Sequence, residues 1–144
     1  MNSDLPPDML GQCMVVKTRQ AARAVTRRYN QLLRPLGIQT TQASLLFAIR
    51  SGRFDSVSDM ANTLGIERSA LTRNLKPLRD MGLVVSDNEG KGRAQRLSLT
   101  PEGAALAVTV LPMWVDAQNA LKAELGERTW NMVQHSLSIM GEVG

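Results

Sequence analysis

The polar side chains between residues 68 and 76 have types and spacing that suit hydrogen bonds to bases and phosphates. Arginine can donate two parallel hydrogen bonds to a guanine edge, and serine or threonine can bond bases or phosphates. We therefore expect Ser69, Thr72 and Arg73 to reach base edges. We expect Arg68 and Lys76 to contact phosphates, which positions a helix without reading sequence. The alternative is a solvated helix face that binds nothing.

The elements that must position these side chains are predicted by the leucines and glycines around them. A helix is expected where apolar residues recur every three or four positions, and here they are Leu71, Leu75 and Leu78. A shorter helix should precede it, because Ser56 followed by Asp59 is an N-cap signature. Gly65 should end that first helix, since a residue after a helix often needs a positive φ. Gly82 should end the second.

A hairpin is predicted next, from strands at residues 83–85 and 97–99 around a glycine-rich basic tip. The order of helix, tight turn, basic helix and hairpin is that of a winged helix-turn-helix, which inserts one helix in a DNA major groove. At the tip, Lys91 and Arg93, with Arg96 near them, suit insertion into a narrow minor groove. An exposed basic loop without that role is the alternative.

Two further predictions concern how these elements are joined. Phe54 should start a short extended segment that pairs with the hairpin. Arg79 should pair either with Asp80 or with the wing, and its sequence neighbours favour neither partner.

The flanking segments predict helices beyond the winged core. We expect helices over residues 8–36, 41–50 and 101–124, and a last helix after Gly126 that carries Trp130, Val133, Leu137 and Met140. Thr100 is a good N-cap and Pro101 suits the first helical position. The fold class is therefore mainly α with a small β-hairpin wing.

The domain organisation follows from the apolar stripes of the outer helices. Within a single chain of residues 1–144, residues 38–100 form the predicted DNA-binding lobe. Residues 8–36 and 101–143 carry apolar stripes longer than a three-helix core needs, so we expect them to form a helical dimerisation region. A symmetric homodimer would place two recognition helices about one DNA turn apart, matching a pseudo-palindromic site.

Composition supports a single cytoplasmic domain that binds nucleic acid. The 144 residues are 43% hydrophobic and carry a net charge of +4. Residues 9–54 hold no acidic residue, whereas acidic residues predominate after Thr100, so a basic lobe and an acidic end are expected. No apolar run is long enough for a membrane span, and no signal peptide is expected.

The chain also lacks the residues that catalysis or cofactor binding would need. With one cysteine, no Cys/His cluster, no glycine-rich phosphate loop and no nucleophile–base pair, we expect no metal, no cofactor and no enzyme activity.

Seven segments of the chain carry a resemblance to a known family, and they are residues 41–46, 57–61, 64–65, 66–73, 75–78, 82–84 and 99–103. This set resembles the MarR family of bacterial transcription regulators over nearly the whole length of the chain. No single segment is diagnostic, but the ordered set is specific. The resemblance implies a homodimeric repressor that binds a pseudo-palindromic operator. It also implies release by a small aromatic or anionic effector, held between the dimer helices and the DNA-binding lobe.

Arg19, Arg23 and Arg27 recur every four residues, so they share one helix face and repel one another slightly. An anionic partner is therefore expected. It is either an effector carboxylate or phenolate bound near Arg19 and Arg23, with Trp114 lining the pocket, or the acidic end of a partner chain, at Glu124, Glu127 or Glu142.

Two alternative functions are also compatible with the sequence. Cys13 resembles in position the reactive cysteine of the hydroperoxide-sensing branch of the family, although a buried free cysteine is usually inert packing. The chain would then be an oxidant-sensing regulator. The second alternative is a winged-helix module that contacts only protein.

Overall fold

The computed structural model describes residues 4–87 and 96–143. The chain divides into two compact units, residues 1–40 and 41–144, which we describe separately. Lys91 and Arg93, predicted at the wing tip, lie outside the described residues, and their roles stay predictions. Among the helices that the structure describes, none combines the length and apolarity that a membrane span requires.

The first unit contains a short helix, a long helix and a turn, where a single helix over residues 8–36 was expected. These elements are α1 (Met9–Gln12), α2 (Met14–Leu33) and the 3-10 turn η1 (Arg34–Leu36). The expectation is wrong at Cys13, whose ψ of 120° is extended. Asp8 has a left-handed φ of 57°, and its carboxylate occupies the space that a Cβ at Gly11 would need. Gly11 therefore leaves room for the Asp8 carboxylate over α1, which forms a separate turn before α2.

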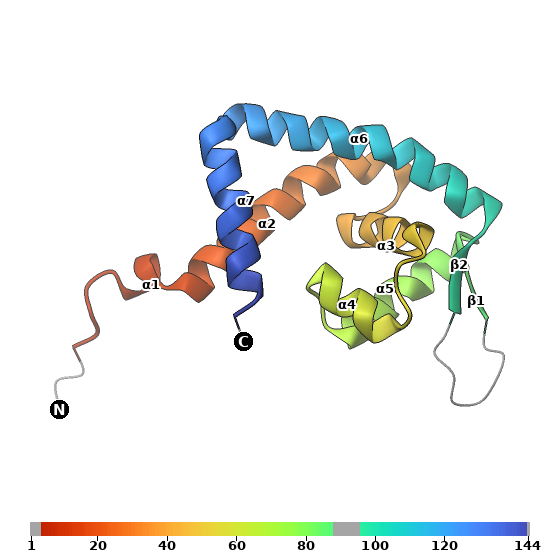
Figure 1. The fold of residues 1–144 in the computed structure, drawn as a ribbon, viewed down its shortest axis with the longest axis horizontal. Coiled ribbons are helices and arrows are strands. Elements are labelled where there is room, and N and C mark those ends of the chain that lie inside the picture. The colour runs from red at the N-terminus through yellow and green to blue at the C-terminus, as the bar shows by residue number, and fades with distance from the viewer. Residues whose placement is uncertain (1–3, 88–95, 144) are drawn as a thin grey trace. The chain divides into compact units, whose positions relative to one another are not determined.

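The second unit contains the predicted winged helix-turn-helix and two further helices. Its elements are α3 (Thr40–Ser51), α4 (Val57–Leu64), α5 (Arg68–Asp80), β1 (Val84–Asp87), β2 (Arg96–Leu99), α6 (Pro101–Leu125) and α7 (Glu127–Gly141). The mainly helical fold with a small hairpin wing is confirmed. Figure 1 shows α3, α4 and α5 gathered on one side of α6, with the hairpin at the N-terminal end of that helix.

The predicted helix boundaries form through local hydrogen bonds. Ser56 Oγ accepts from the backbone N–H of Asp59 at 3.0 Å, and Gly65 ends α4 with a φ of 67°. Thr100 Oγ1 accepts from the N–H of Gly103 at 3.0 Å at the start of α6. Each cap satisfies a backbone donor that has no partner within its own helix.

The wing is an antiparallel pair in which Val84 lies opposite Leu99. The strand expected at Phe54 does not form in the described part of the chain, where the sheet has two strands. The segment between α3 and α4 is too short, because Gly52 is left-handed and Ser56 already caps α4. Phe54 instead lines, with Arg96, a hollow of about 370 Å³ beside β2.

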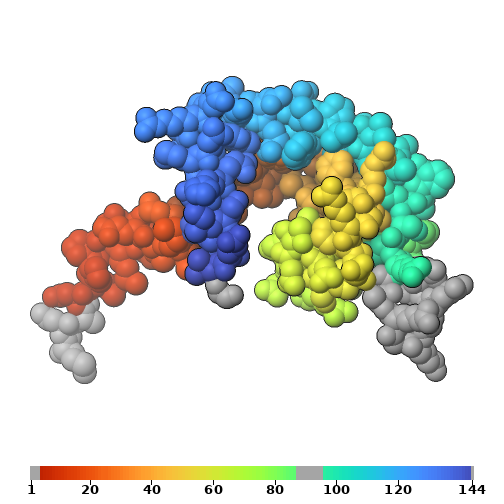
Figure 2. Space-filling view, in the orientation of Figure 1, coloured from red at the N-terminus to blue at the C-terminus, as the bar shows by residue number. Residues whose placement is uncertain are grey.

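Leucines dominate the core of the second unit. Side chains that are at most 2% exposed come from α3, α4, α5, β1 and α6, and they are Leu45, Leu46, Ala61, Leu71, Leu75, Leu78, Val84, Ala107 and Val110. By contrast, α7 contributes no buried residue. Figure 2 shows α7 extending from the end of α6 and standing apart from the α3–α5 lobe. The winged lobe is therefore fully packed, whereas α7 is not.

Candidate nucleic-acid interface

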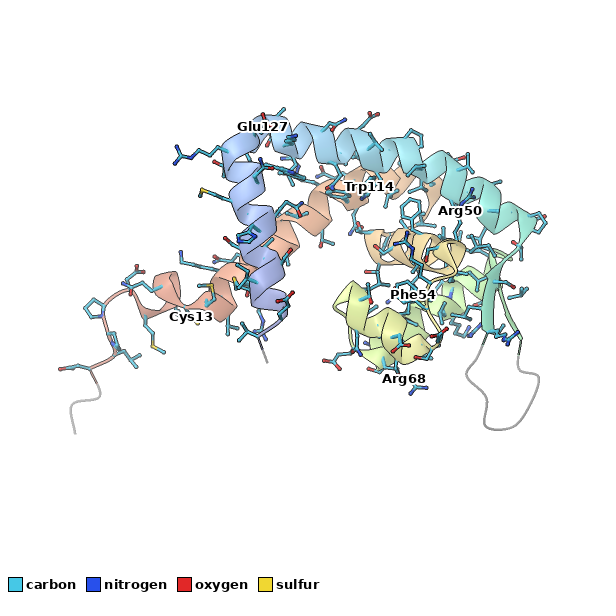
Figure 3. All side chains as sticks on the ribbon, viewed as in Figure 1. Cys13, Arg50, Phe54, Arg68, Trp114 and Glu127 are labelled. Atoms are coloured by element: carbon cyan, nitrogen blue, oxygen red, sulfur yellow. The ribbon has the colours of Figure 1, made fainter. Side chains whose placement is uncertain are left out.

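The orientation of α5 is fixed by its buried leucines. Leu71 and Leu78 are 0% exposed and Leu75 is 1% exposed. The polar residues predicted to contact DNA are all exposed on the remaining faces, and they are Arg68, Ser69, Thr72, Arg73 and Lys76. Figure 3 shows Arg68 projecting from the side of the α4–α5 pair that faces away from α6. The helix is thus anchored along one side and offers donors along the other.

Hydrogen bonds within α5 distinguish the side chains on this exposed face. Thr72 Oγ1 donates to the carbonyl oxygen of Arg68 at 3.1 Å, so its hydroxyl proton is already used. No hydrogen bond to a described residue engages Ser69 or Arg73. These two side chains keep their donors for a ligand, whereas Thr72 offers an acceptor and a methyl group.

Lys76 forms an ion pair one helical turn along α5. Its Nζ lies 2.9 Å from Asp80 Oδ2, and the two side chains are 77% and 63% exposed. An exposed pair of this kind contributes at most about 1 kcal/mol. A DNA phosphate could therefore replace the carboxylate, although Asp80 would compete with it.

Arg79 joins the recognition helix to the wing. Its Nε donates to Ser86 Oγ on β1 at 2.8 Å. Of the two partners expected for Arg79, the structure selects the wing, because Asp80 is engaged by Lys76. On β2, Arg96 is exposed at the end of the described strand and lies opposite Asp87 in the register.

The segment after α5 connects the recognition helix to α6. The N–H of Leu83 donates to the Leu78 carbonyl at 2.9 Å, and the N–H of Thr100 donates to the Leu83 carbonyl at 3.1 Å. Thr100 Oγ1 also donates to the carbonyl of Gly82 at 2.6 Å. A Cβ at Gly103 would overlap the carbonyl oxygen of Leu83. The recognition helix, the wing and α6 are thus tied together at one point.

Two of the three residues predicted to bind an effector, Arg23 and Trp114, line separate hollows in separate units. Arg23 lines a hollow of about 830 Å³ in the first unit, and Arg19 is not among its lining residues. Trp114 lines an apolar hollow of about 440 Å³ in the second unit, together with Phe47 and Phe54. An effector-binding role for Arg19, Arg23 and Trp114 stays a prediction.

Cys13 is half-buried and free at the junction of α1 and α2. A redox role for it stays a prediction. Across the described ranges, no three histidine, cysteine or acidic side chains cluster in a way that could hold a metal ion.

Several residues that shape these sites were not predicted as partners. Ser86 anchors Arg79, and Asp80 pairs with Lys76. The four-residue spacing of Lys76 and Asp80 was a signal for their pairing. Asn30 and Arg34 line the same hollow as Arg23. The sequence contained a signal for this, because residues 30 and 34 continue the helix face on which Arg23 and Arg27 lie.

The fold and this surface define a winged helix-turn-helix protein, and comparisons identify its family. Residues 36–94 match the model of the MarR family. The crystal structure of the M. tuberculosis transcriptional regulator MosR in complex with DNA has a TM-score of 0.80 and 34% sequence identity, covering 91% of this chain and 95% of that one.

Two transcriptional regulators also match over part of their length. NmtR of Mycobacterium tuberculosis is 35% identical over 72 residues, which are 50% of this chain. The uncharacterised regulator YwoH of Bacillus subtilis is 25% identical over 84 residues, which are 58% of this chain. The chain spans 55% of the length of NmtR and 61% of that of YwoH. The chain belongs to the MarR family of winged helix-turn-helix transcriptional regulators, which are DNA-binding proteins and not enzymes.

Proposed function

We propose that this protein is a homodimeric repressor that binds a pseudo-palindromic operator with one α5 helix in the major groove of each half-site. The observation that carries the proposal is the division of α5 into a buried leucine face and an exposed face of donors. The relative MosR, solved in complex with DNA, supports the same use of the winged lobe.

In this proposal the exposed residues of α5 divide into two roles. Ser69 and Arg73 read base edges with their free donors, and Thr72 contributes a methyl group and an acceptor. Arg68 and Lys76 neutralise phosphates on either side of the groove. On the wing, Lys91, Arg93 and Arg96 contact the adjacent minor groove or its phosphates.

The proposed dimer is supported by the apolar side chains that α7 leaves uncovered. Val133 is 39% exposed and Leu137 is 53% exposed, and the two lie one helical turn apart on the same face of α7. A helix of 15 residues without a buried side chain gains little from packing in one chain, although helices in proteins depend on such packing. A second copy covering α7, together with the exposed apolar residues of α1 and α2, would supply it.

We further propose that an anionic or aromatic small molecule weakens operator binding by acting on Arg19, Arg23 and Trp114. Arg23 and Trp114 each line a hollow large enough for a ligand or part of one. Such a ligand releases DNA if it binds the DNA-free conformation more tightly than the bound one.

Selection of genomic fragments by the full chain tests the proposal. We expect the recovered fragments to share a two-fold symmetric site with half-sites about one DNA turn apart. The winged helix would be a module that contacts only protein if no fragment were enriched over heparin competitor.

A further inference from the structure

A hollow beside the C-terminal half of α2 contains basic and amide side chains. It measures about 830 Å³ and lies wholly within the first unit. Its polar lining residues are Arg23, Thr26, Arg27, Asn30, Gln31, Arg34 and Gln39. Ala22 and Ile38 add apolar wall, and Ile38 is only 3% exposed. Pockets that hold small ligands commonly have volumes of about 300–1,000 Å³.

The amide of Asn30 has a defined orientation in this hollow. Its Oδ1 accepts hydrogen bonds from the N–H of Thr40 at 2.7 Å and from Thr40 Oγ1 at 2.6 Å. Because Oδ1 is engaged by two donors, the Asn30 side chain has its NH₂ group left to offer a ligand. The side chain thus presents donors beside three guanidinium groups that are donors only.

The positive charge of the hollow is not neutralised locally. No acidic residue lines it, and residues 9–54 contain none. Among the residues that the structure describes, no ion pair or hydrogen bond engages the guanidinium groups of Arg23, Arg27 or Arg34. Burial raises the pKa of the neighbouring Tyr29 phenol, an effect that Arg28 partly offsets, so this phenol stays neutral.

We propose that this hollow binds a small organic anion with at least two negative charges, of the phosphate-ester class. Arg23, Arg27 and Arg34 would pair with the oxygens of the anion, and the Asn30 amide would add a neutral donor. Guanidinium groups match phosphate oxygens in geometry and form strong, charge-assisted hydrogen bonds. The apolar wall formed by Ala22 and Ile38 would receive the organic part.

Binding of the anion is independent of any operator, whereas its use as a regulatory signal rests on the proposed function. The full chain without DNA should therefore be titrated calorimetrically with inorganic pyrophosphate as the probe. We expect saturable binding that Arg27→Gln and Arg34→Gln each weaken by roughly tenfold or more, the loss of about one charge-assisted hydrogen bond. Lys17→Gln, which removes a charge from α2 outside the hollow, should leave the affinity within about twofold.

Three results would overturn this proposal. The first is the absence of saturable binding at millimolar pyrophosphate, and the second is an equal loss of pyrophosphate affinity in Lys17→Gln and Arg27→Gln. The third is a loss of operator affinity in Arg27→Gln, measured without pyrophosphate, that equals the loss in Arg73→Ala. The last result would mean that the arginines contact DNA. Arg73→Ala should bind pyrophosphate with the affinity of the parent protein. A failure of the proposed DNA binding and a failure of the proposed anion site can therefore be told apart by measuring the two affinities separately.

Discussion

Arg79 on the recognition helix donates a hydrogen bond of 2.8 Å from its Nε to Ser86 Oγ on the first strand of the wing. The bond links the two elements that are proposed to enter adjacent grooves of DNA. Arg79 is half-buried, so its guanidinium is held more firmly than an exposed side chain would be. The position of the wing therefore depends on the position of α5.

Ser86→Ala should loosen the wing. Loss of this hydrogen bond should reduce the free energy of unfolding by about 0.5–1.5 kcal/mol, and operator affinity should fall because the wing is no longer held against α5. Chemical denaturation and fluorescence anisotropy measure the two effects. Ser98→Ala, at an exposed position on β2, is the matched control and should change neither. Equal behaviour of the two variants would show that the Arg79–Ser86 bond is dispensable.

Arg73→Ala and Lys76→Ala should have different signatures. Arg73→Ala should weaken specific binding by about 1–3 kcal/mol and relax one or two operator positions. Lys76→Ala should weaken binding to all sequences alike and flatten the slope of log affinity against log salt by roughly one unit. Competition assays with operator and random DNA separate these outcomes. Equal losses on both kinds of DNA in both variants would contradict the assigned roles.

Asp80→Asn should strengthen DNA binding. The Asp80 carboxylate lies 2.9 Å from Lys76 Nζ and would repel a nearby phosphate, so its removal frees the ammonium group. Stability should change by less than about 1 kcal/mol because the pair is exposed. Asp116→Asn, an equal change of charge on the exposed surface of α6, is the control. A variant that binds no more tightly than this control would place Lys76 away from the DNA.

The features predicted correctly from the sequence are those set by neighbouring residues. The caps at Ser56 and Thr100 involve backbone donors three residues away, so short patterns identify them. The break at Cys13 was not predicted, because the apolar residues on both sides of it keep helical spacing. That spacing gives no sign of the left-handed φ at Asp8. The prediction of a strand at Phe54 was wrong, because strand pairing also depends on the length of chain between α3 and α4.

Contacts between distant residues could not be predicted in the same way. The bond between Asn30 and Thr40 spans ten residues and depends on the turn after α2. The choice of Ser86 as the partner of Arg79 depends on how the hairpin leaves α5. At both places the residue types indicated which donors and acceptors were present, but only the fold determines which of them form hydrogen bonds with each other.

Leu137→Asp should disrupt the proposed dimer. Leu137 is 53% exposed on α7, where a partner chain would bury it, and a carboxylate there would be desolvated without a counter-charge. Light scattering should show a monomer at micromolar concentration, and operator affinity should fall because only one half-site is bound at a time. His135→Asp, on the opposite face of α7, should remain dimeric. A monomeric parent protein would contradict the proposal directly.

Gly103→Ala should destabilise the protein although alanine favours helices. The intrinsic gain from replacing glycine in a helix is about 1 kcal/mol. At Gly103, however, the new Cβ would overlap the carbonyl oxygen of Leu83, a backbone atom that also accepts the N–H of Thr100 at 3.1 Å. Relief of the overlap requires α6 to move away from the end of the recognition helix, so we expect a net loss of about 1–3 kcal/mol, as for overpacked cores. Gly141→Ala on α7, where a Cβ meets nothing within 4 Å, should be neutral or slightly stabilising. Thermal denaturation of both variants decides the matter, since a Gly103→Ala protein as stable as Gly141→Ala would mean that α6 is not held against Leu83.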